Sequence, residues 1–134
     1  MADCGTVIHP KNLGNQLTGG AVQGFGFALT EKHVFDTKLG LAATKGLHGA
    51  KPLTYLDVPL DMQWEAVNQP DKYNPVGVKG IGEPPLGAAA SAVLSAISDA
   101  LGGVFFNRTP VTCDMILNAA EKKPQSYKPF EVNV

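Results

Sequence analysis

Glu83 is the residue of this sequence whose type and setting most clearly suggest acid–base chemistry. It is the single acid in the stretch Gly77–Gly87, which also holds four glycines and the adjacent prolines Pro84 and Pro85. Glycine allows backbone angles that other residues avoid, whereas proline fixes φ and restricts the residue before it. We therefore expect a stiff turn at the start of a helix, where Glu83 has an extended backbone and a fixed carboxylate. On these features alone, a solvated turn acid is the commoner alternative.

Gln16 and Gln23 are two amide side chains that lie seven residues apart, which is about two helical turns. Their amides would then face the same way and could hydrogen-bond either a polar ligand or a neighbouring segment of backbone. The residues alone favour the neighbouring segment. Lys79 lies four positions before Glu83 and could neutralise it, but this spacing fixes no contact outside a helix.

The sequence shows no pattern of metal ligands. His9, His33 and His48 lie in separate segments, which is typical of surface or hydrogen-bonded histidines. Cys4 and Cys113 are far apart and form no C-x-x-C pair, so both are expected to be free thiols in a reducing, cytoplasmic setting. The chain also has neither a serine-hydrolase elbow nor a phosphate-binding glycine motif.

The composition indicates one domain with unusually little charge. The chain has 134 residues and a formal net charge of −1, and 17% of its residues are charged, compared with about 25% in ordinary soluble domains. It has no basic field to bind nucleic acid, no apolar run near the ~18 residues of a membrane span and no signal peptide. Low charge together with 15 glycines and 10 prolines suggests that other protein covers much of the surface.

Helices and short strands must position the candidate residues, so the expected fold class is α+β. Apolar residues at helical spacing predict three helices, at 13–32, 87–101 and 112–121. Gly102 and Gly103 end the second helix, and Thr112 caps the third. Glycine inside a helix costs about 1 kcal/mol relative to alanine, so the glycines of the first helix indicate close approach of another backbone or a ligand.

Extended segments are expected between the helices. Alternating apolar residues and turn signals predict strands or extended segments at 6–8, 53–56, 61–67 and 104–106. They also predict a hairpin-like segment at 34–41, followed by a loop at 42–52. Residues 124–134 form a tail without periodicity, either extended along another surface or disordered.

Four blocks of sequence, in order, resemble one known family. Residues 3–10 look like its Asp-x-Gly-x-x-Ile/Leu-Asn-Pro block, and residues 16–26 like its Gly-Gln-Ile/Val-x-Gly-Gly-x-x-Gln-Gly-Leu-Gly block. Residues 79–85 look like its Gly-x-Gly-Glu-Pro-Pro loop, and residues 109–112 are similar to the start of its closing helix. Together the blocks resemble the molybdenum hydroxylases, the xanthine dehydrogenase–aldehyde oxidase family. Each block is weak alone, but their order and spacing agree along nearly all of the chain.

The resemblance implies that residues 1–134 are a C-terminal portion of the family's molybdopterin-binding subunit. Residues 1–32 would then be the cofactor-side strand and helix, and residues 77–101 the catalytic loop and helix. The family's subunit is several times longer, so the chain is expected to be a split subunit, a truncated product or a cut piece. Alone it is expected to bind molybdopterin poorly and to catalyse nothing.

The resemblance also implies roles for single residues. The glutamate of the Gly-Glu-Pro-Pro loop, here Glu83 after Gly82, would be the general base beside molybdenum. The glutamine of the first helix, here Gln16, would contact the pterin together with Gly82, and no protein side chain would bind the metal. His9 stands where the family has asparagine, and Asn15 where it has glycine, which puts the cofactor contacts of the first helix in more doubt than the base.

The implied reaction is hydroxylation of an aldehyde or of an N-heteroaromatic, purine-like ring, with water as the oxygen source. A general base works best when its pKa lies near the operating pH, and burial in an apolar pocket raises a carboxylate pKa. The cofactor would be molybdopterin, possibly in its cytosine dinucleotide form, with FAD and 2Fe–2S centres on partner chains. The partners would be the rest of the molybdenum subunit, iron–sulfur and flavin subunits, and a small-molecule substrate.

Two alternatives remain beside this interpretation. The chain could be a catalytically silent fragment, an interaction remnant that keeps the fold without the cofactor. It could also be an unrelated α+β domain with a chance Gly-Glu-Pro-Pro sequence.

Overall fold

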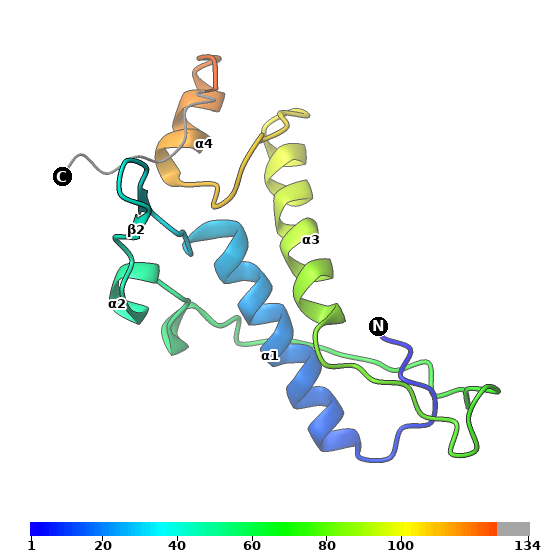
Figure 1. Cartoon of the computed structure of the whole chain (residues 1–134). Coiled ribbons are helices and arrows are strands. Elements are labelled where there is room, and N and C mark those ends of the chain that lie inside the picture. The colour runs from blue at the N-terminus through cyan, green and yellow to red at the C-terminus, as the bar shows by residue number, and fades with distance from the viewer. Residues whose placement is uncertain (126–134) are drawn as a thin grey trace.

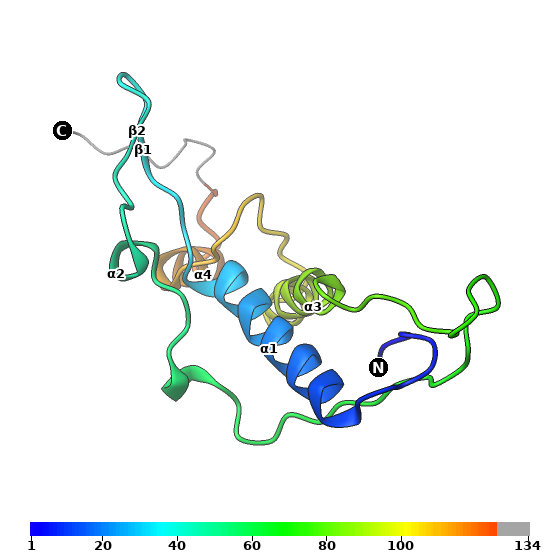
Figure 2. The same ribbon diagram turned by 60° about the horizontal axis from the view of Figure 1, so that its bottom comes forward.

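Two helices that are far apart in sequence form the centre of the computed structural model, which describes residues 1–125. In chain order the elements are α1 (Pro10–Leu29), β1 (Phe35–Asp36), β2 (Leu41–Ala42), α2 (Leu47–Ala50), the 3-10 helix η1 (Tyr55–Asp57), α3 (Pro84–Ala100) and α4 (Cys113–Ala120). Helices α1 and α3 pack side by side in two views, and long loops connect the other elements (Figures 1 and 2). The mixed fold class is confirmed, but the described part has four α-helices, not the three predicted.

Helix α1 begins at Pro10, earlier than the predicted Leu13, and ends at Leu29. Proline is well suited to the first helical position, because its missing N–H would have no partner there and its φ is already helical. His9 caps the helix, since its Nδ1 accepts the Asn12 N–H at 3.2 Å. Pro10, two residues after the extended segment predicted at 6–8, therefore starts a helix.

Glycines of α1 allow the backbone of α3 to come close. A Cβ added at Gly24 would lie 2.3 Å from the Leu86 carbonyl oxygen and 2.9 Å from the Ala89 Cβ. A Cβ at Gly20 would lie 3.0 Å from the Pro85 Cβ. The prediction that these glycines mark a close approach of another backbone is confirmed, and that backbone is the first half of α3.

Helix α3 begins at Pro84, not at the predicted Gly87, and Glu83 is its N-cap residue. The backbone of Glu83 has φ −111° and ψ −15°, so the prediction of an extended conformation is wrong. The reason is the helix start itself, because the Glu83 carbonyl accepts the Leu86 N–H at 3.0 Å and must point along the helix axis to do so. Forming this turn outweighs the preference of a pre-proline residue for extended angles.

The predicted C-terminus of the second helix and the predicted N-terminus of the third agree with the structure. Gly102 and Gly103 follow α3 with φ of +75° and +92°, the left-handed region that glycine tolerates. Thr112 is the N-cap residue of α4, as predicted, although its hydroxyl donates to the Asp114 carboxylate at 2.5 Å and does not bind the helix backbone.

The described residues contain less β-structure than predicted. The hairpin is confirmed, because β1 and β2 pair antiparallel, with Phe35 opposite Ala42. No strand forms at 6–8, 61–67 or 104–106; the first two regions contribute only single bridges nearby, Ala2 to Ala66 and Gly5 to Val78. Alternating side chains suit a strand, but a strand also needs a partner over several residues.

Two short helices lie in segments for which other structure was predicted. The segment 53–56, predicted to be extended, enters η1, where the Asp57 carboxylate accepts the Thr54 N–H as part of a capping box and also accepts the Thr54 hydroxyl. Helix α2 lies inside the predicted loop 42–52. The predicted tail falls almost entirely on residues 126–134, outside the described residues.

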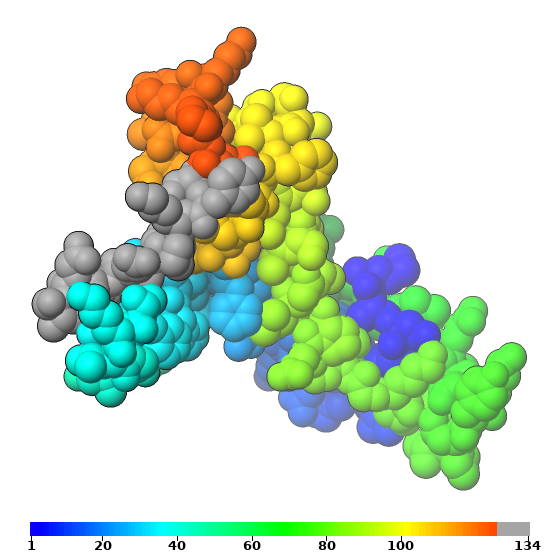
Figure 3. Space-filling view, turned by 45° about the horizontal axis from the view of Figure 1, so that its top comes forward, coloured from blue at the N-terminus to red at the C-terminus, as the bar shows by residue number. Residues whose placement is uncertain are grey.

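Few large apolar side chains of the described residues are buried. The buried hydrophobic residues are Cys4, Leu13, Ala28 and Val111. In contrast, Tyr55 and Leu56 are more than 90% exposed, and Tyr73 and Phe105 more than 80%. The outline is open, with the hairpin and the loop around residue 75 standing away from the helices (Figure 3). None of the described helices has both the length and the apolar character needed to cross a membrane.

Candidate functional site

The N-terminal segment pairs with the loop that leads to Glu83. The Gly77 carbonyl accepts the Thr6 N–H at 2.7 Å, and the Lys79 N–H donates back to the Cys4 carbonyl at 2.7 Å. These two bonds form the antiparallel bridge noted above. The loop is therefore fixed four residues before the candidate base.

The same N-terminal segment is also held on its other edge. The Ala2 N–H donates to the Glu65 carbonyl at 3.0 Å, and the Ala2 carbonyl accepts the Val67 N–H at 2.9 Å. The side chain of Asn68 accepts the Val7 N–H at 2.9 Å. The segment thus lies between residues 65–68 and the Glu83 loop and links the two.

The crossing of the N-terminal segment and the loop requires glycine at two positions. Gly5 and Gly77 have φ of +68° and +72°, and a Cβ on Gly5 would lie 2.1 Å from the Gly77 carbonyl oxygen. A Cβ on Gly77 would lie 2.9 Å from the Pro70 Cβ. No other residue type fits both the backbone angle and the space.

Asp3 forms an ion pair with Lys79, whose Nζ lies 2.6 Å from the Asp3 Oδ2. The other oxygen of Asp3 accepts the Gly5 N–H at 3.0 Å. The hydrogen bond from Lys79 lowers the pKa of Asp3, and the same bond raises the pKa of Lys79. Lys79 is therefore engaged by Asp3, and its suggested pairing with Glu83 does not occur.

Asn74 is a second residue that holds the loop, and sequence reasoning did not single it out. Its Oδ1 accepts the N–H groups of Gly77 (2.6 Å) and Val78 (3.1 Å). Its Nδ2 donates to the Asp71 carboxylate and to the Val78 carbonyl, both at 2.9 Å. The Asp-x-x-Asn-Pro sequence from Asp71 to Pro75 is a turn signal that could have identified it.

Glu83 carries an exposed carboxylate at the start of α3 that no helix N–H engages. An N-cap side chain normally accepts an N–H from the second or third helical residue. Here Pro84 and Pro85 have no N–H, and the Leu86 N–H already binds the carbonyl of Glu83 itself. The described residues show no ion pair to this carboxylate either. The two prolines therefore leave it without a hydrogen bond at the helix start, and residues 1–125 do not form the expected apolar pocket around it.

Gln16 lies on α1 and binds the loop directly, because its Nε2 donates to the Gly82 carbonyl at 2.5 Å. Gln23 is exposed, and its side-chain amide forms no hydrogen bond with the described residues. Two interpretations of the glutamine pair were open, a polar ligand or a neighbouring segment of backbone. For Gln16 the structure shows the backbone contact. The structure gives the two amides different surroundings, although they share one helix.

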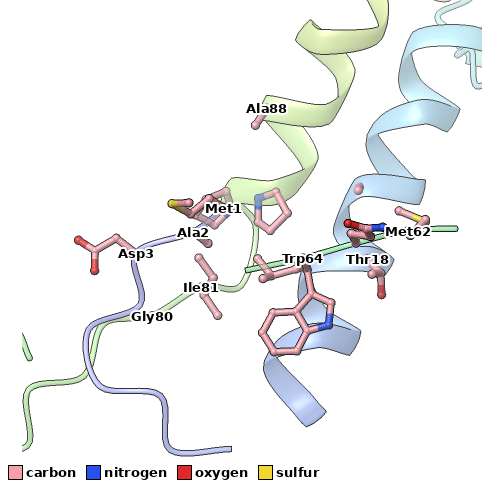
Figure 4. Close-up of a pocket in the computed structure, with 14 residues that line it drawn as sticks. Met1, Ala2, Asp3, Thr18, Met62, Trp64, Gly80, Ile81 and Ala88 are labelled. Atoms are coloured by element: carbon pink, nitrogen blue, oxygen red, sulfur yellow. The ribbon is translucent and has the colours of Figure 1, made fainter. Parts of the chain in front are cut away.

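Two hollows flank the loop, and Ile81 lines both. One has a volume of about 390 Å³ and lies among Trp64, Met62 and Pro85, with Trp64 against the first turns of α1 (Figure 4). The other, which we call the Gln16 hollow, has a volume of about 350 Å³. Its walls include the polar side chains of His9, Asn12 and Gln16 together with Lys79 and Gly82.

The Gln16 hollow combines apolar walls, among them Val7 and Leu13, with hydrogen-bonding groups that a cofactor could use. Nothing lies within 4 Å of a Cβ built at Gly82, so a ligand could approach the backbone there. Gln16 uses one amide hydrogen on Gly82 and keeps a second hydrogen and an oxygen for a ligand. These residues therefore fit a pterin-like group with several donors and acceptors.

Residues 1–125 show no group of three His, Cys, Asp or Glu side chains that could hold a metal ion. His9 is the cap of α1, and the ring of His33 stacks on Phe35 with centroids 6.3 Å apart. Cys4 and Cys113 are free thiols, as predicted.

Comparisons with known proteins show which proteins this chain is similar to. A family model described as a molybdopterin cofactor-binding domain matches residues 1–59. The nicotine 6-hydroxylase large subunit of Paenarthrobacter nicotinovorans is 33% identical over 90% of this chain, which covers 15% of that protein. The putative xanthine dehydrogenase molybdenum-binding subunit XdhA of Escherichia coli K12 is 33% identical over 82% of this chain, which covers 14% of it.

A solved structure agrees with these relatives. Quinoline 2-oxidoreductase from Pseudomonas putida 86 superposes with a TM-score of 0.81 and 34% sequence identity, over 91% of this chain and 16% of its own. The chain is similar to one segment of the molybdenum-binding subunit of the xanthine dehydrogenase–aldehyde oxidoreductase family, as its motifs suggested. It spans about 15% of the curated relatives it matches.

Proposed function

We propose that this chain supplies the general-base glutamate of a molybdenum hydroxylase, and that Glu83 is that base. The observation that carries the proposal is the start of α3, where two prolines leave the Glu83 carboxylate without a capping N–H. A carboxylate that serves as a helix cap is already committed to a donor, whereas an uncommitted one is available to accept a proton. Its carrier loop is held by Asp3, Asn74 and Gln16.

The cofactor in this proposal is molybdopterin, for which Gln16 and Gly82 supply contacts in the Gln16 hollow. When bound, this cofactor would supply the acceptor for the two electrons of the substrate C–H bond, which breaks as the carbon–oxygen bond forms. Glu83 removes a proton from the water-derived nucleophile as the new carbon–oxygen bond forms. General-base help of this kind typically contributes about 10²–10⁴ in rate. The cytosine dinucleotide form of the cofactor stays a prediction.

The substrate class in this proposal is an N-heteroaromatic ring, with aldehydes as the alternative. Relatives named for nicotine, hypoxanthine and quinoline support the ring, and an aldehyde oxidoreductase of Megalodesulfovibrio gigas, 31% identical, supports the alternative.

Partner chains are part of the proposal, because this chain covers so little of its relatives. The rest of the molybdenum subunit would cover the exposed apolar residues and complete the pocket around Glu83. Iron–sulfur and flavin subunits would carry electrons away through 2Fe–2S centres and FAD. The division into residues 1–32, 77–101 and 124–134 and the cytoplasmic location also stay predictions.

The decisive experiment replaces the base in the assembled enzyme. We expect Glu83→Gln to reduce turnover by about 10²–10⁴ while the molybdenum content stays unchanged. Glu121→Gln is the matched control, since Glu121 is an exposed acid whose partner is Lys123. Near-wild-type turnover of Glu83→Gln would contradict the proposal. If the chain then still co-purified with a larger molybdenum-containing chain, the catalytically silent interaction remnant would be the better interpretation.

A further inference from the structure

We infer that Gln16 is a positioning residue for Glu83, acting through the backbone of Gly82; this inference rests on the proposed function. The Gln16 Nε2 donates to the Gly82 carbonyl at 2.5 Å. That carbonyl belongs to the peptide unit that joins Gly82 to Glu83. Because a peptide unit is planar, holding its oxygen also fixes the direction in which the backbone enters Glu83.

The loop needs this contact because little else holds it. Before it, Lys79 is anchored by its backbone bond to Cys4, and after it α3 begins at Pro84. Among the described residues, Gln16 makes the only hydrogen bond to residues 80–82. Two of these three residues are glycines, whose backbone angles are otherwise loosely restricted.

Gln16 is well placed to be an anchor, because it lies on a helix that packs directly on α3. The close approach of Gly24 to Leu86 joins the helix that carries the amide to the helix that follows the base. An amide also adds no charge beside a carboxylate, so it can position Glu83 without neutralising it. Base and anchor therefore share one rigid helix pair.

The positioning role is separable from a contact with the cofactor. The bond to Gly82 occupies one Nε2 hydrogen, and the other hydrogen and Oε1 remain. A ligand in the Gln16 hollow could use these atoms at the same time. Loss of the amide would then affect turnover by two routes, through the direction of Glu83 and through the ligand, and these routes can be distinguished.

The first test uses the assembled enzyme and compares Gln16→Met, of similar length but without a donor, with Gln23→Met as the matched control. We expect Gln16→Met to lower kcat by about 10- to 100-fold, since misplacing a catalytic group by ~1 Å can cost this much. KM should stay near the wild-type value, and kcat is expressed per bound molybdenum so that a lower cofactor content does not enter the comparison. Gln23→Met should behave as wild type in every respect.

A double variant separates a positioning role from a direct one. If Gln16 acts only through Glu83, Gln16→Met adds no further loss of kcat in the Glu83→Gln background. Losses of kcat per bound molybdenum that multiply in the double variant would overturn the inference. If Glu83→Gln itself is active, the proposed function fails.

A second measurement does not depend on activity. In the 134-residue chain, ¹⁵N relaxation should show greater backbone motion at residues 80–83 in Gln16→Met than in wild type or Gln23→Met. Unchanged relaxation at these residues would contradict the positioning role even if the proposed function is correct. Increased motion together with an active Glu83→Gln enzyme would support the role of Gln16 in holding the loop and would contradict the role of Glu83 as the general base.

Discussion

The Nζ of Lys79 lies 2.6 Å from the Asp3 carboxylate, 76 positions away in sequence, although Glu83 is only four positions away. Lys79 is the one cation of the stretch Gly77–Gly87, so this pair removes the nearest counter-charge from Glu83 along the chain. The same pair ties the N-terminal segment to the loop. Asp3 therefore leaves the candidate base unpaired and also helps to fix its loop.

The first prediction is that Asp3→Asn lowers stability in a pH-dependent way. The pKa of Asp3 is lowered by Lys79, so the unfolded chain binds that proton more tightly than the folded chain. The stabilisation is present above the ordinary value of 3.8 and is lost as the pH falls through the lowered pKa. Because the pKa of Lys79 is raised, the stabilisation is fully present up to the ordinary value of 10.5 and is lost as the pH rises further.

Urea unfolding at pH 7 and near pH 2 checks this prediction. Wild type should be slightly more stable than Asp3→Asn at pH 7, and the two should become equal at low pH. The effect is small because both side chains are exposed. A difference that persisted at low pH would show that Asn disturbs the loop by another route.

The second prediction concerns the packing of α1 on α3. Gly24→Ala should destabilise the chain by about 1–3 kcal/mol, because the new methyl group would overlap the backbone of Leu86. Gly19→Ala is the control, since nothing lies within 4 Å of a Cβ there. It should stabilise the chain by about 0.5–1 kcal/mol through helix propensity. Urea unfolding gives both free energies, and equal effects of the two substitutions would rule out the close packing.

The third prediction concerns His9, which stands where related sequences were expected to have asparagine. Its Nδ1 accepts the Asn12 N–H, as an asparagine oxygen would at a helix N-cap. His9→Asn should therefore keep the stability of α1, whereas His9→Ala should cost about 0.5–2 kcal/mol. Thermal unfolding followed by circular dichroism compares the variants. If His9→Ala matched wild type, the cap would contribute nothing to stability.

Sequence reasoning located the middles of the three long helices but not where two of them start. Period-3.6 spacing is a local signal, so residues such as Leu17 and Leu94 are assigned without knowledge of the fold. Pro10 and Pro84 lie three residues before the predicted helix starts, yet each is the first residue of a helix. Proline both stops and starts helices, and only the residues it meets in space decide between the two.

The candidate site was predictable in its residues but not in its contacts. Glu83 and Gln16 were identified from motifs, and their catalytic and cofactor roles stay predictions. The bond from Gln16 to Gly82 joins residues 66 positions apart, and no spacing rule reaches that far. The predicted strands failed for the same reason, because Ala2 meets Ala66 at a single bridge.

The bridge between Gly5 and Val78 also bears on how the chain folds. Pairing such distant segments requires closing a long loop, whose entropic cost grows with its length, and contacts of this kind slow folding. The packing of α1 on α3 closes nearly the same loop, so either event brings the partners of the other together. The loop that carries Glu83 therefore depends on contacts between distant segments. It should fold in the same cooperative step as the pair of helices α1 and α3.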